Sequence, residues 1–240
     1  MQKNITIYCD FDGTITQQDA VDYLLENLAS PEWLDLEARW KEGEIGSREC
    51  LSKQIPLIKG GWNAVNNLIG EIKVDPFFKS FSNYCNKKNI SLYIVSEGLE
   101  RVIETILERE EISVTEIWSN KLEINKTGDF TLGFPYPPES KNCTLGLCKC
   151  QILGNDSSKN LKVVIGDGLN DICWAKNADL VFAKSKLLNH CNSNNIPCIP
   201  FNNFSKINSI LKKMLEEDIS IIAGELVKNP KQKNHARKNK

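Results

Sequence analysis

The sequence predicts an α/β fold with a parallel sheet whose functional site lies at the carboxyl ends of the strands. The prediction rests on apolar, β-branched runs that each end in small, polar or acidic residues. These are ITIYC before DFDGT at 5–14, LYIV before SEG at 92–98, and LKVVI before GDGLND at 161–171. Buried parallel strands form such continuous apolar runs, and ligands bind beyond their carboxyl ends. We therefore expect a three-layer, Rossmann-like architecture.

The composition fits an ordinary globular protein. The chain has 240 residues, of which 41% are hydrophobic and 25% charged, enough for one core and an insertion. A net charge of −1 gives no electrostatic reason to expect nucleic acid or a membrane as partner. The chain lacks a run of about eighteen apolar residues, and its N-terminus enters a strand at once. We therefore expect no transmembrane helix or signal peptide, a cytoplasmic location and mostly reduced cysteines.

A long helical stretch interrupts the α/β pattern after the first strand, at 4–10. The helices expected in it are 22–28, 33–41, 47–55 and 62–72. The stretch is too long for a single crossover connection, so it indicates an inserted helical cap that acts as a lid over the strand ends. The expected division is a core of 1–16 and 74–227 with a cap of 17–73.

After the cap, strands and helices alternate again. The elements expected there are a helix at 76–84, a strand at 92–95, a helix at 98–109, a hairpin of 117–124 and 130–134, a helix at 145–153, a strand at 161–165, a helix at 171–176, strands at 180–183 and 196–201, and a helix at 211–215. The tail at 228–240 is basic with little apolar content, so we expect it to be disordered. It is either a solvated tail or a contact for a polyanion.

The run DFDGT has the residues of a catalytic centre. Side chains alternate along an extended strand, so Asp10 and Asp12 leave the strand end on the same side. Two carboxylates this close repel unless a cation or a shared proton lies between them. Gly13 permits a sharp turn, and Thr14 offers a hydroxyl where the next helix begins. The alternative, a β-turn with solvated acids, is disfavoured by the second acidic motif, GDGLND.

Together these residues resemble a known family. The run DFDGT, Ser96, Lys149 and the run GDGLND are similar to the four ordered motifs of the haloacid-dehalogenase-like (HAD) phosphatases. The insertion at 17–73 resembles the C1-type cap of the phosphoserine-phosphatase-like branch, subclass IB. A narrower resemblance, to the methionine-salvage enol-phosphate phosphatases, is carried by 10–19, 47–51 and 143–149.

The resemblance implies roles for the acidic residues. Asp10 is the expected nucleophile, which forms an aspartyl-phosphate, and Asp12 the general acid and then the general base. Alternatively, Asp12 is only an electrostatic partner of the metal; the resemblance also makes its backbone carbonyl a metal ligand. Mg²⁺ is the expected cofactor, with Asp10 and Asp167 as direct ligands and Asp171 acting through water or holding Asp167 in place. Alternatively, Asp171 is a helix N-terminal residue favoured by the helix dipole.

Transfer of a phosphoryl group needs donors for its remaining oxygens. The family pattern assigns this role to the Ser96 hydroxyl, the Gly98 N–H at the start of the next helix, and Lys149. Glu97 and Asn170 are counted with this phosphate-binding set. Because helix N-termini bind anions readily, the run SEG suits phosphate on physical grounds alone.

The cap is expected to select the substrate through Asp19 and Arg48. Asp19 stands where phosphoserine-specific relatives carry a glutamate that reads the substrate amine, and Arg48 is suited to reading a carboxylate or another anion. Either is alternatively a solvated helix charge. Gly13, where that branch usually has Ser, and the shorter Asp19 favour the methionine-salvage substrate over phosphoserine. The aromatic residues expected to line the pocket, or else to belong to the core, are Trp62, Phe77 and Tyr136.

Cysteine and histidine indicate no further site. The chain has nine cysteines, an odd number that cannot pair completely. Cys143, Cys148 and Cys150 lie close together in sequence but lack the paired spacing and the fourth ligand of common zinc sites. We expect them to form a reduced, packed cluster. The histidines are His190, expected on a surface helix, and His235, in the tail.

The favoured function is Mg²⁺-dependent hydrolysis of a small phosphorylated metabolite, most of all a methionine-salvage enol phosphate. Phosphoserine hydrolysis and phosphotransfer to an alcohol are the alternatives within the family. A dehalogenase is disfavoured because that chemistry has no use for Asp12. A catalytically silent binding module is the remote alternative. The protein is expected to be a monomer or a homodimer.

Overall fold

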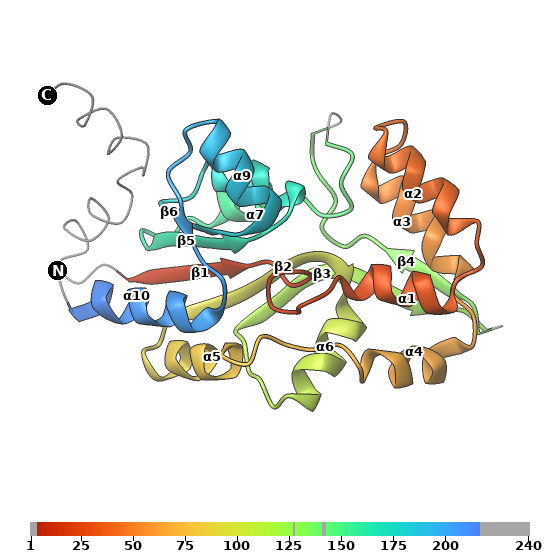
Figure 1. Ribbon diagram of the computed structural model, residues 1–240, viewed down its shortest axis with the longest axis horizontal. Helices are drawn as coiled ribbons and strands as arrows, with labels where there is room; N and C mark the ends of the chain where they lie inside the picture. The colour runs from red at the N-terminus through yellow and green to blue at the C-terminus, as the bar shows by residue number, and fades with distance from the viewer. Residues whose placement is uncertain (1–3, 127, 141–142, 217–240) are drawn as a thin grey trace, which may run out of the picture.

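The computed structural model describes residues 4–126, 128–140 and 143–216, and it confirms the α/β fold with a mostly parallel sheet (Figure 1). Within these residues the strands form one sheet of order β4-β3-β2-β1-β5-β6-β7, in which only the β3–β4 pair is antiparallel. The strands are β1 (Ile5–Cys9), β2 (Ser91–Leu99), β3 (Glu116–Ile124), β4 (Phe130–Gly133), β5 (Leu161–Gly166), β6 (Leu180–Ala183) and β7 (Ile199–Pro200).

Helices cover both faces of the sheet, as Figure 1 shows with α5, α6 and α10 below it and α7 and α9 above. The helices are α1 (Ala20–Leu28), α2 (Trp33–Lys41), α3 (Ser47–Gln54), α4 (Gly61–Ile69), α5 (Phe78–Lys87), α6 (Glu100–Arg109), α7 (Lys149–Asn155), α8 (Ile172–Ala175), α9 (Ser185–Ser193) and α10 (Phe204–Glu216), with short 3₁₀ turns η1 (Ile55–Leu57) and η2 (Leu169–Asp171). None of them combines the length and the hydrophobicity needed to cross a membrane.

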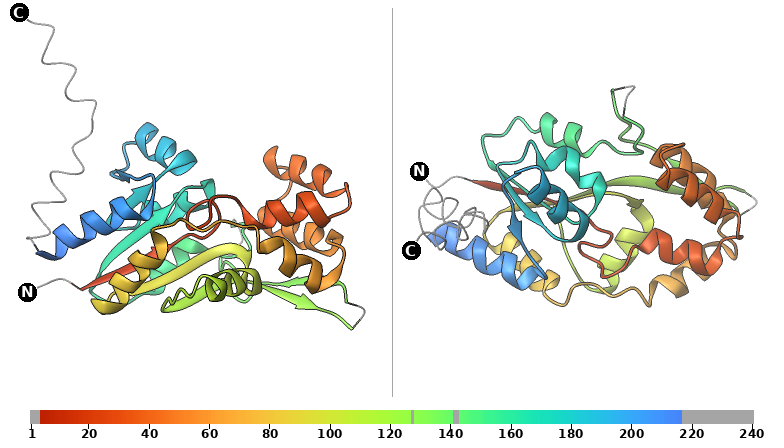
Figure 2. Two further views of the ribbon diagram at one scale, coloured as in Figure 1. Left: turned by 60° about the horizontal axis from the view of Figure 1, so that its bottom comes forward. Right: turned by 45° about the horizontal axis from the view of Figure 1, so that its top comes forward.

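The strands that were expected to end in functional residues are neighbours. β1 pairs with β2 on one side and with β5 on the other, and Cys9 is opposite both Ile94 and Ile165. Because the strands run in parallel at this register, their acidic endings meet at one edge of the sheet. This edge faces α1, α2 and α3 (Figure 2).

Alternation along β1 divides the core into two apolar layers. Ile5, Ile7 and Cys9 pack in the cluster that includes the buried residues of α5, α6 and α10. Tyr8 points to the other face, where it joins the cluster of α7, α8 and α9 that surrounds Trp174. Strands buried on both faces are typical of parallel sheets, and they hold the carboxyl ends of β1, β2 and β5 in fixed positions.

The chain leaves and re-enters the core at adjacent points. Thr16 and Val74 form an isolated antiparallel bridge, and the Gln17 N–H donates to the Lys73 carbonyl at 2.9 Å. The segment between these crossings contains α1, α2, α3, η1 and α4, and Figure 2 shows α1, α2 and α3 beyond the carboxyl ends of β1 and β5. On this basis we propose to keep the division into a cap of 17–73 and a core of 1–16 and 74–227, of which 1–3, 127, 141–142 and 217–227 lie outside the described residues.

Several element boundaries differ from the expectation. The helix expected at 145–153 begins at Lys149, because the chain before it forms a loop whose N–H groups bond elsewhere. Gly98 belongs to β2, and α6 begins at Glu100, so the expectation that Gly98 starts a helix is wrong. The strand expected at 196–201 is reduced to β7. The sequence predicted α9 only in the sense that His190 was expected on a surface helix. The expected tail, which contains His235, lies outside the described residues.

Candidate active site

A cavity of about 540 Å³ lies at the carboxyl edge of β1, β2 and β5, between the core and the cap. The core residues that line it include Asp10, Asp12, Ser96, Glu97, Gly98, Lys149, Asp167 and Asn170. The cap residues that line it include Asp19, Asp22, Glu37, Trp40, Ser47, Leu51 and Gln54. Residues from four separate segments of the core, predicted to act together, therefore share one cavity with the cap.

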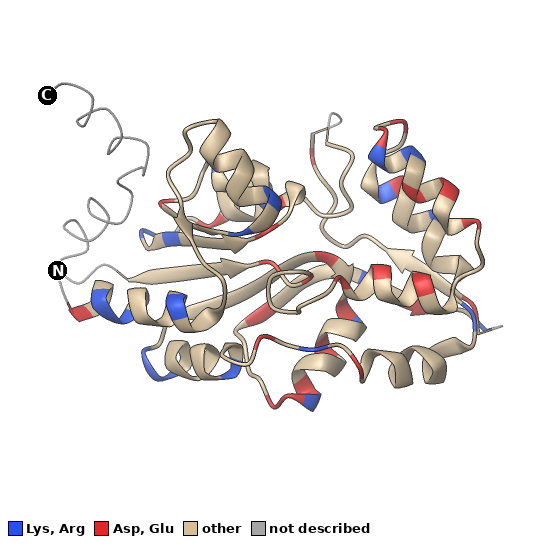
Figure 3. Cartoon of the chain, viewed as in Figure 1, with Lys and Arg blue, Asp and Glu red and all other residues tan. Residues whose placement is uncertain are grey.

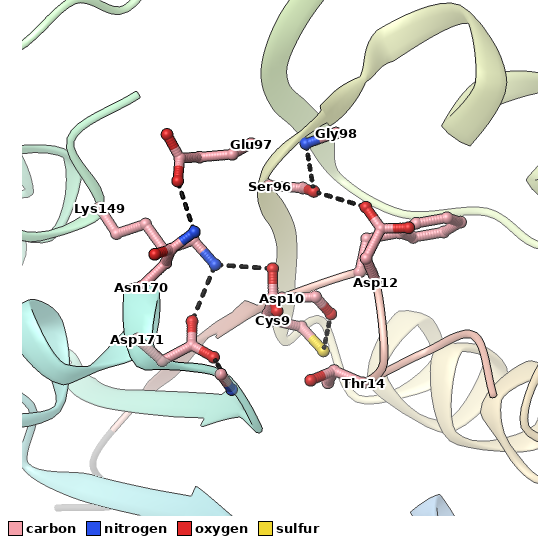
Figure 4. Close-up of polar contacts among 12 residues, drawn as sticks. Cys9, Asp10, Asp12, Thr14, Ser96, Glu97, Gly98, Lys149, Asn170 and Asp171 are labelled. Carbon is pink, nitrogen blue, oxygen red and sulfur yellow. Dashed lines mark hydrogen bonds and ion pairs between the residues drawn. The ribbon is translucent and has the colours of Figure 1, made fainter. Parts of the chain in front are cut away.

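Lys149 lines the core side of this cavity and lies between Asp10 and Asp171 (Figure 4). Its Nζ donates to Asp10 Oδ1 at 2.6 Å and to Asp171 Oδ1 at 2.8 Å, and the side chain is only 2% exposed. Burial alone lowers the pKa of the ammonium, but the two carboxylates outweigh burial and hold that pKa above its usual range. Lys149 is therefore a permanent positive charge beside Asp10.

The second acidic motif is organised by Asp171. Its Oδ2 accepts the backbone N–H groups of Asp167 and Gly168, both at 2.9 Å, while its Oδ1 accepts from Lys149. Both oxygens of this fully buried carboxylate are engaged within the protein. This arrangement favours the interpretation that Asp171 holds Asp167 in place over the interpretation that it acts on the metal through water.

Asp167 faces the turn of the first motif. The Thr14 hydroxyl donates to Asp167 Oδ1 at 2.8 Å, which differs from the expected helix-start role because α1 begins only at Ala20. Gly13 has φ of +70°, and a Cβ there would lie 2.8 Å from Asp167 Oδ2. The turn therefore requires glycine both for its backbone conformation and for the close approach of Asp167.

The acidic residues fit a hard divalent cation. One carboxylate oxygen from each of Asp10, Asp167 and Asp171 lies within 4.8 Å of the others. Burial, followed by the charge of Asp171, raises the pKa of Asp10 to about 8, even though Lys149 opposes the shift. The raised pKa reflects the crowding of three carboxylates around one ammonium, and a divalent cation would relieve it. The donors are oxygens, the ligand type that Mg²⁺ prefers.

Asp12 lies on the side of the cavity nearest the cap. Its Oδ1 accepts the Ala20 N–H at 2.8 Å, and the Ser96 hydroxyl lies 3.4 Å from its Oδ2. Burial and then the charges of Asp19 and Asp10 raise the pKa of this carboxyl well above its usual range. The shift favours the protonated form of Asp12, which is the form that a general acid needs.

Gly98 packs directly against this acid. Its N–H donates to the Ser96 Oγ at 2.9 Å, and a Cβ at Gly98 would lie 2.5 Å from Asp12 Oδ2 and 3.0 Å from Ser96 Oγ. The N–H expected to bind phosphate is thus used to orient the Ser96 hydroxyl. Of the two residues, Ser96 is the one placed to donate into the cavity.

Glu97 and Asn170 have partners that differ from the expectation. The Glu97 carboxylate accepts from the Ser47 hydroxyl and the Gly146 N–H, each at 2.7 Å, and from Asn170 Nδ2 at 2.5 Å (Figure 4). A carboxylate has no proton to donate to phosphate, and these three donors occupy both of its oxygens. The structure therefore argues against phosphate binding by the Glu97 side chain. The Asn170 amide, also expected to bind phosphate, donates to Glu97 instead.

The expected cap residues divide into one that faces the cavity and one that does not. Asp19 lines the cavity, and its carboxylate caps α1 by accepting the N–H groups of Val21 and Asp22. Arg48 is exposed, lies outside the cavity lining, and stacks over the Phe134 ring at 4.8 Å. The structure favours the alternative, an exposed helix charge, over the expectation that Arg48 reads the substrate, because its position on α3 directs it toward Phe134.

The aromatic residues proposed for the pocket are elsewhere. Trp62 on α4 lies under Arg101 at 3.9 Å, and Phe77 is exposed at the start of α5. Tyr136 lines a second cavity of about 440 Å³ with Tyr8 and Trp118. None of the three lines the active-site cavity as the described residues define it.

Sequence reasoning missed the cap residues that do line the cavity. Glu37 and Trp40 on α2, Ser47 at the start of α3, and Asp22 on α1 were not singled out. The spacing of Glu37, Trp40 and Lys41 on one helical face was the available signal, but it does not tell which surface a face will cover. Figure 3 shows that α1 carries only acidic charges, whereas α2 and α3 carry both signs.

The cysteines near Lys149 are free thiols. Cys148 Sγ and Cys150 Sγ are 3.3 Å apart, and burial raises the pKa of Cys150 to about 12. Cys143 is also free and partly buried. The three lie around the start of α7 as a packed group, in agreement with the expected reduced cluster. His190 is a partly buried residue of α9.

The architecture and the site define a class of protein, and sequence comparison agrees with them. The sequence model of the haloacid dehalogenase-like hydrolases matches residues 7–176. The chain belongs to this family, and the prediction of a HAD phosphatase, a phosphoric monoester hydrolase, is confirmed.

Individual relatives are more specific. The chain is 32% identical over 219 residues to the 2-hydroxy-3-keto-5-methylthiopentenyl-1-phosphate phosphatase of Bacillus cereus (strain ATCC 10987 / NRS 248), covering 89% of this chain and 98% of the relative. Among solved structures, a HAD family hydrolase from Salmonella enterica serovar Typhi aligns with a TM-score of 0.69 at 20% identity, over 90% of this chain and 72% of that one. A phosphoserine phosphatase from T. onnurineus aligns with a TM-score of 0.64 at 17% identity, over 88% and 95%. The two structures establish the fold alone.

Proposed function

We propose that the protein is a Mg²⁺-dependent phosphomonoesterase that acts through an aspartyl-phosphate on a methionine-salvage enol phosphate. The observation that carries the proposal is the buried Lys149 ammonium held between Asp10 and Asp171 at the carboxyl edge of the sheet. It places a fixed positive charge beside a carboxylate that a phosphate dianion would otherwise repel.

In the first half of the reaction, Asp10 attacks phosphorus. Lys149 holds Oδ1, so Oδ2 is the attacking oxygen, and a new oxygen–phosphorus bond forms as the bond to the ester oxygen breaks. Asp12 gives its proton to the leaving oxygen, a role that its raised pKa supports. The Ser96 hydroxyl and Lys149 donate to the phosphoryl oxygens.

In the second half, the Asp12 carboxylate accepts a proton from water as the water oxygen attacks phosphorus. The bond between phosphorus and Asp10 then breaks and inorganic phosphate leaves. A bound Mg²⁺ supplies charge neutralisation between the nucleophile and the phosphate. Asp10 and Asp167 are the residues proposed to hold it, with the Asp12 carbonyl as a further ligand and Asp171 orienting Asp167.

The residues that line the cap half of the cavity are evidence for a substrate with an apolar tail. Val21, Cys50, Leu51 and the half-buried Trp40 line it and suit a methylthio group. The similarity to the Bacillus cereus phosphatase supports the same substrate. A second candidate, phosphoserine or another amine-bearing phosphoester, is favoured by carboxylates on this wall. Those that line it are Asp19, Asp22 and Glu37.

The test is phosphate release from an enol phosphate of the methionine-salvage type, phosphoserine and a sugar phosphate, compared by kcat/KM. Matched variants separate the two candidates, because Trp40→Ala removes apolar contact and Asp22→Asn removes charge with little change of shape. We expect the enol phosphate to be preferred, and Trp40→Ala to lower its kcat/KM about tenfold while Asp22→Asn leaves it nearly unchanged. Preference for phosphoserine, with Asp22→Asn as the damaging variant, would contradict the substrate assignment.

The remaining alternatives give different products. Phosphotransfer would yield a new ester in place of inorganic phosphate when an alcohol is supplied, and a silent binding module would yield neither. The cytoplasmic location and the monomeric or homodimeric state remain predictions. The same panel, run with an added alcohol and with detection of a new ester, distinguishes these alternatives.

A further inference from the structure

Glu97 is a buried carboxylate that the proposed chemistry does not use. Glu97 lies on β2 between Ser96 and Gly98 and is only 9% exposed. Burial raises the pKa of its carboxyl group. A buried acid is costly unless it is fully hydrogen-bonded, so its partners must offset the desolvation of this group.

The partners of Glu97 come from three separate parts of the chain. Ser47 belongs to the first turn of α3 in the cap, Gly146 to the loop before α7, and Asn170 to the 3₁₀ turn η2. Ser47 and Gly146 both donate to Oε1, and Asn170 donates to Oε2. One carboxylate therefore joins the cap to two segments of the core.

A second contact joins the same end of α3 to the same loop. The Arg48 N–H donates to the Thr144 carbonyl at 3.1 Å, and a Cβ at Gly46 would lie 2.3 Å from Thr144 Cβ. The start of α3 therefore packs against the loop so closely that position 46 has no room for a side chain. The cap and the loop meet as one junction around Glu97.

Each of the two core segments that Glu97 holds also carries a residue of the proposed mechanism. The loop at Gly146 leads within three residues to Lys149, which begins α7. Asn170 immediately precedes Asp171, and Ser96 immediately precedes Glu97 itself. Movement of the cap away from Glu97 would thus remove a donor from the point where these segments meet.

We propose that Glu97 is a positioning residue that latches the cap onto the core and couples closure of the cap to the placement of Lys149 and Asp171. The inference rests on the proposed phosphatase function for its kinetic consequence, but the latch itself is a structural property. A carboxylate suits the position because it only accepts, and its two oxygens meet donors from three segments of the chain. A glutamine would present an N–H₂ group to one of those donors.

The first test removes the cap side of the latch alone. Ser47→Ala deletes one hydroxyl and leaves Glu97 bound to Gly146 and Asn170, whereas Ser47→Thr keeps the hydroxyl. We expect Ser47→Ala to raise KM about tenfold with a smaller change in kcat, because the cap closes less often, and Ser47→Thr to restore KM. Glu49→Gln, an exposed change on the same helix, is the control and should match the wild type.

The second test asks whether the two residues act as one unit. Glu97→Gln should lower kcat as well as raise KM, since it also loosens the loop before Lys149 and the turn before Asp171. The Ser47→Ala/Glu97→Gln double variant should be no worse than Glu97→Gln alone. Additive losses, or a wild-type KM in Ser47→Ala, would overturn the latch.

A measurement without substrate separates the latch from the proposed function. Amide hydrogen exchange of α3 and of residues 143–148 should rise together in Ser47→Ala and Glu97→Gln but not in Glu49→Gln. Exchange confined to the mutated element would contradict coupling between cap and core. Failure of the wild type to hydrolyse any phosphoester would contradict the function and leave this exchange result to decide the latch.

Discussion

The core wall and the cap wall of the cavity are built in different ways. In the core wall the carboxylates are held by buried partners, with Lys149 between Asp10 and Asp171 and the Thr14 hydroxyl on Asp167. In the cap wall, Ser47, Glu37 and Gln54 are also buried, but Asp22 is exposed and Trp40 is only half-buried. Rigid groups suit the invariant part of a substrate, the phosphate, and adaptable groups suit the part that differs between substrates. The comparison indicates that the core determines the reaction and the cap determines the substrate.

Among changes to the core wall, replacing Lys149 should cause the largest loss of activity. Lys149→Met keeps the length of the side chain but leaves Asp10 and Asp171 buried without their counter-charge. We expect kcat to fall by at least about 10²-fold on every phosphoester, and the metal-free protein to lose about 3–5 kcal/mol of unfolding free energy. Lys53→Met, an exposed cap lysine, is the matched control.

Both quantities are measured by steady-state phosphate release and by urea unfolding in EDTA. If Lys149→Met retained full activity on one ester and lost it on another, Lys149 would contribute to specificity. Such a result would contradict the assignment of the reaction to the core.

A smaller effect is expected from adding one methyl group to the core wall. Gly98→Ala places a Cβ 2.5 Å from Asp12 Oδ2, so the acid must move. We expect kcat to fall about tenfold with little change in KM, because proton transfer depends on the position of Asp12. Gly154→Ala on α7, where a Cβ has no neighbour within 4 Å, should leave kcat unchanged. Equal kinetics for the two variants would show that Asp12 is free to move.

The pH dependence tests how the cap wall acts on the core. The Asp19 charge is, after burial, the largest cause of the raised pKa of Asp12. Protonated Asp12 is the active acid, so activity is present below this pKa and lost as the pH rises through it. Asp19→Asn removes a negative charge, keeps the cap of α1, and lowers the pKa of Asp12. The alkaline limb of the profile of kcat/KM against pH should therefore move to lower pH.

The control for this profile is Asp35→Asn, a change at an exposed carboxylate on α2. It should leave the alkaline limb in place. An unmoved limb in Asp19→Asn would mean that the limb belongs to a group other than Asp12.

The smallest effect is expected at Arg48, which sequence reasoning placed in the substrate pocket. Its guanidinium is exposed and lies over Phe134, so Arg48→Ala should cost at most about 1 kcal/mol of stability. We expect its kcat/KM to stay within about twofold of the wild type on all esters in the panel. A substrate-selective rise in KM would return Arg48 to the binding site.

The contrast between the two walls also explains what the sequence could predict. Asp10, Asp12 and Asp167 follow buried strands, and Ser96 lies in the last part of β2. The alignment of parallel strands brings such positions together without knowledge of loops. The partners of Glu97 could not be foreseen, because a hydrogen bond from Ser47 across about fifty residues depends on how the cap docks. The pocket positions expected for Arg48, Trp62 and Tyr136 differ from the structure for the same reason. Helical or aromatic character does not indicate which surface a residue will contact.

The most direct test of the account is phosphate release by the wild type and Asp10→Asn on the preferred ester, with Mg²⁺ and with EDTA. Asparagine has nearly the same shape as aspartate but lacks the ionised oxygen that attacks phosphorus. We predict Mg²⁺-dependent turnover in the wild type and a loss of at least about 10³-fold in Asp10→Asn, with both proteins folded by their thermal unfolding curves. Turnover by Asp10→Asn at a rate near that of the wild type would contradict Asp10 as the nucleophile and, with it, the proposed mechanism.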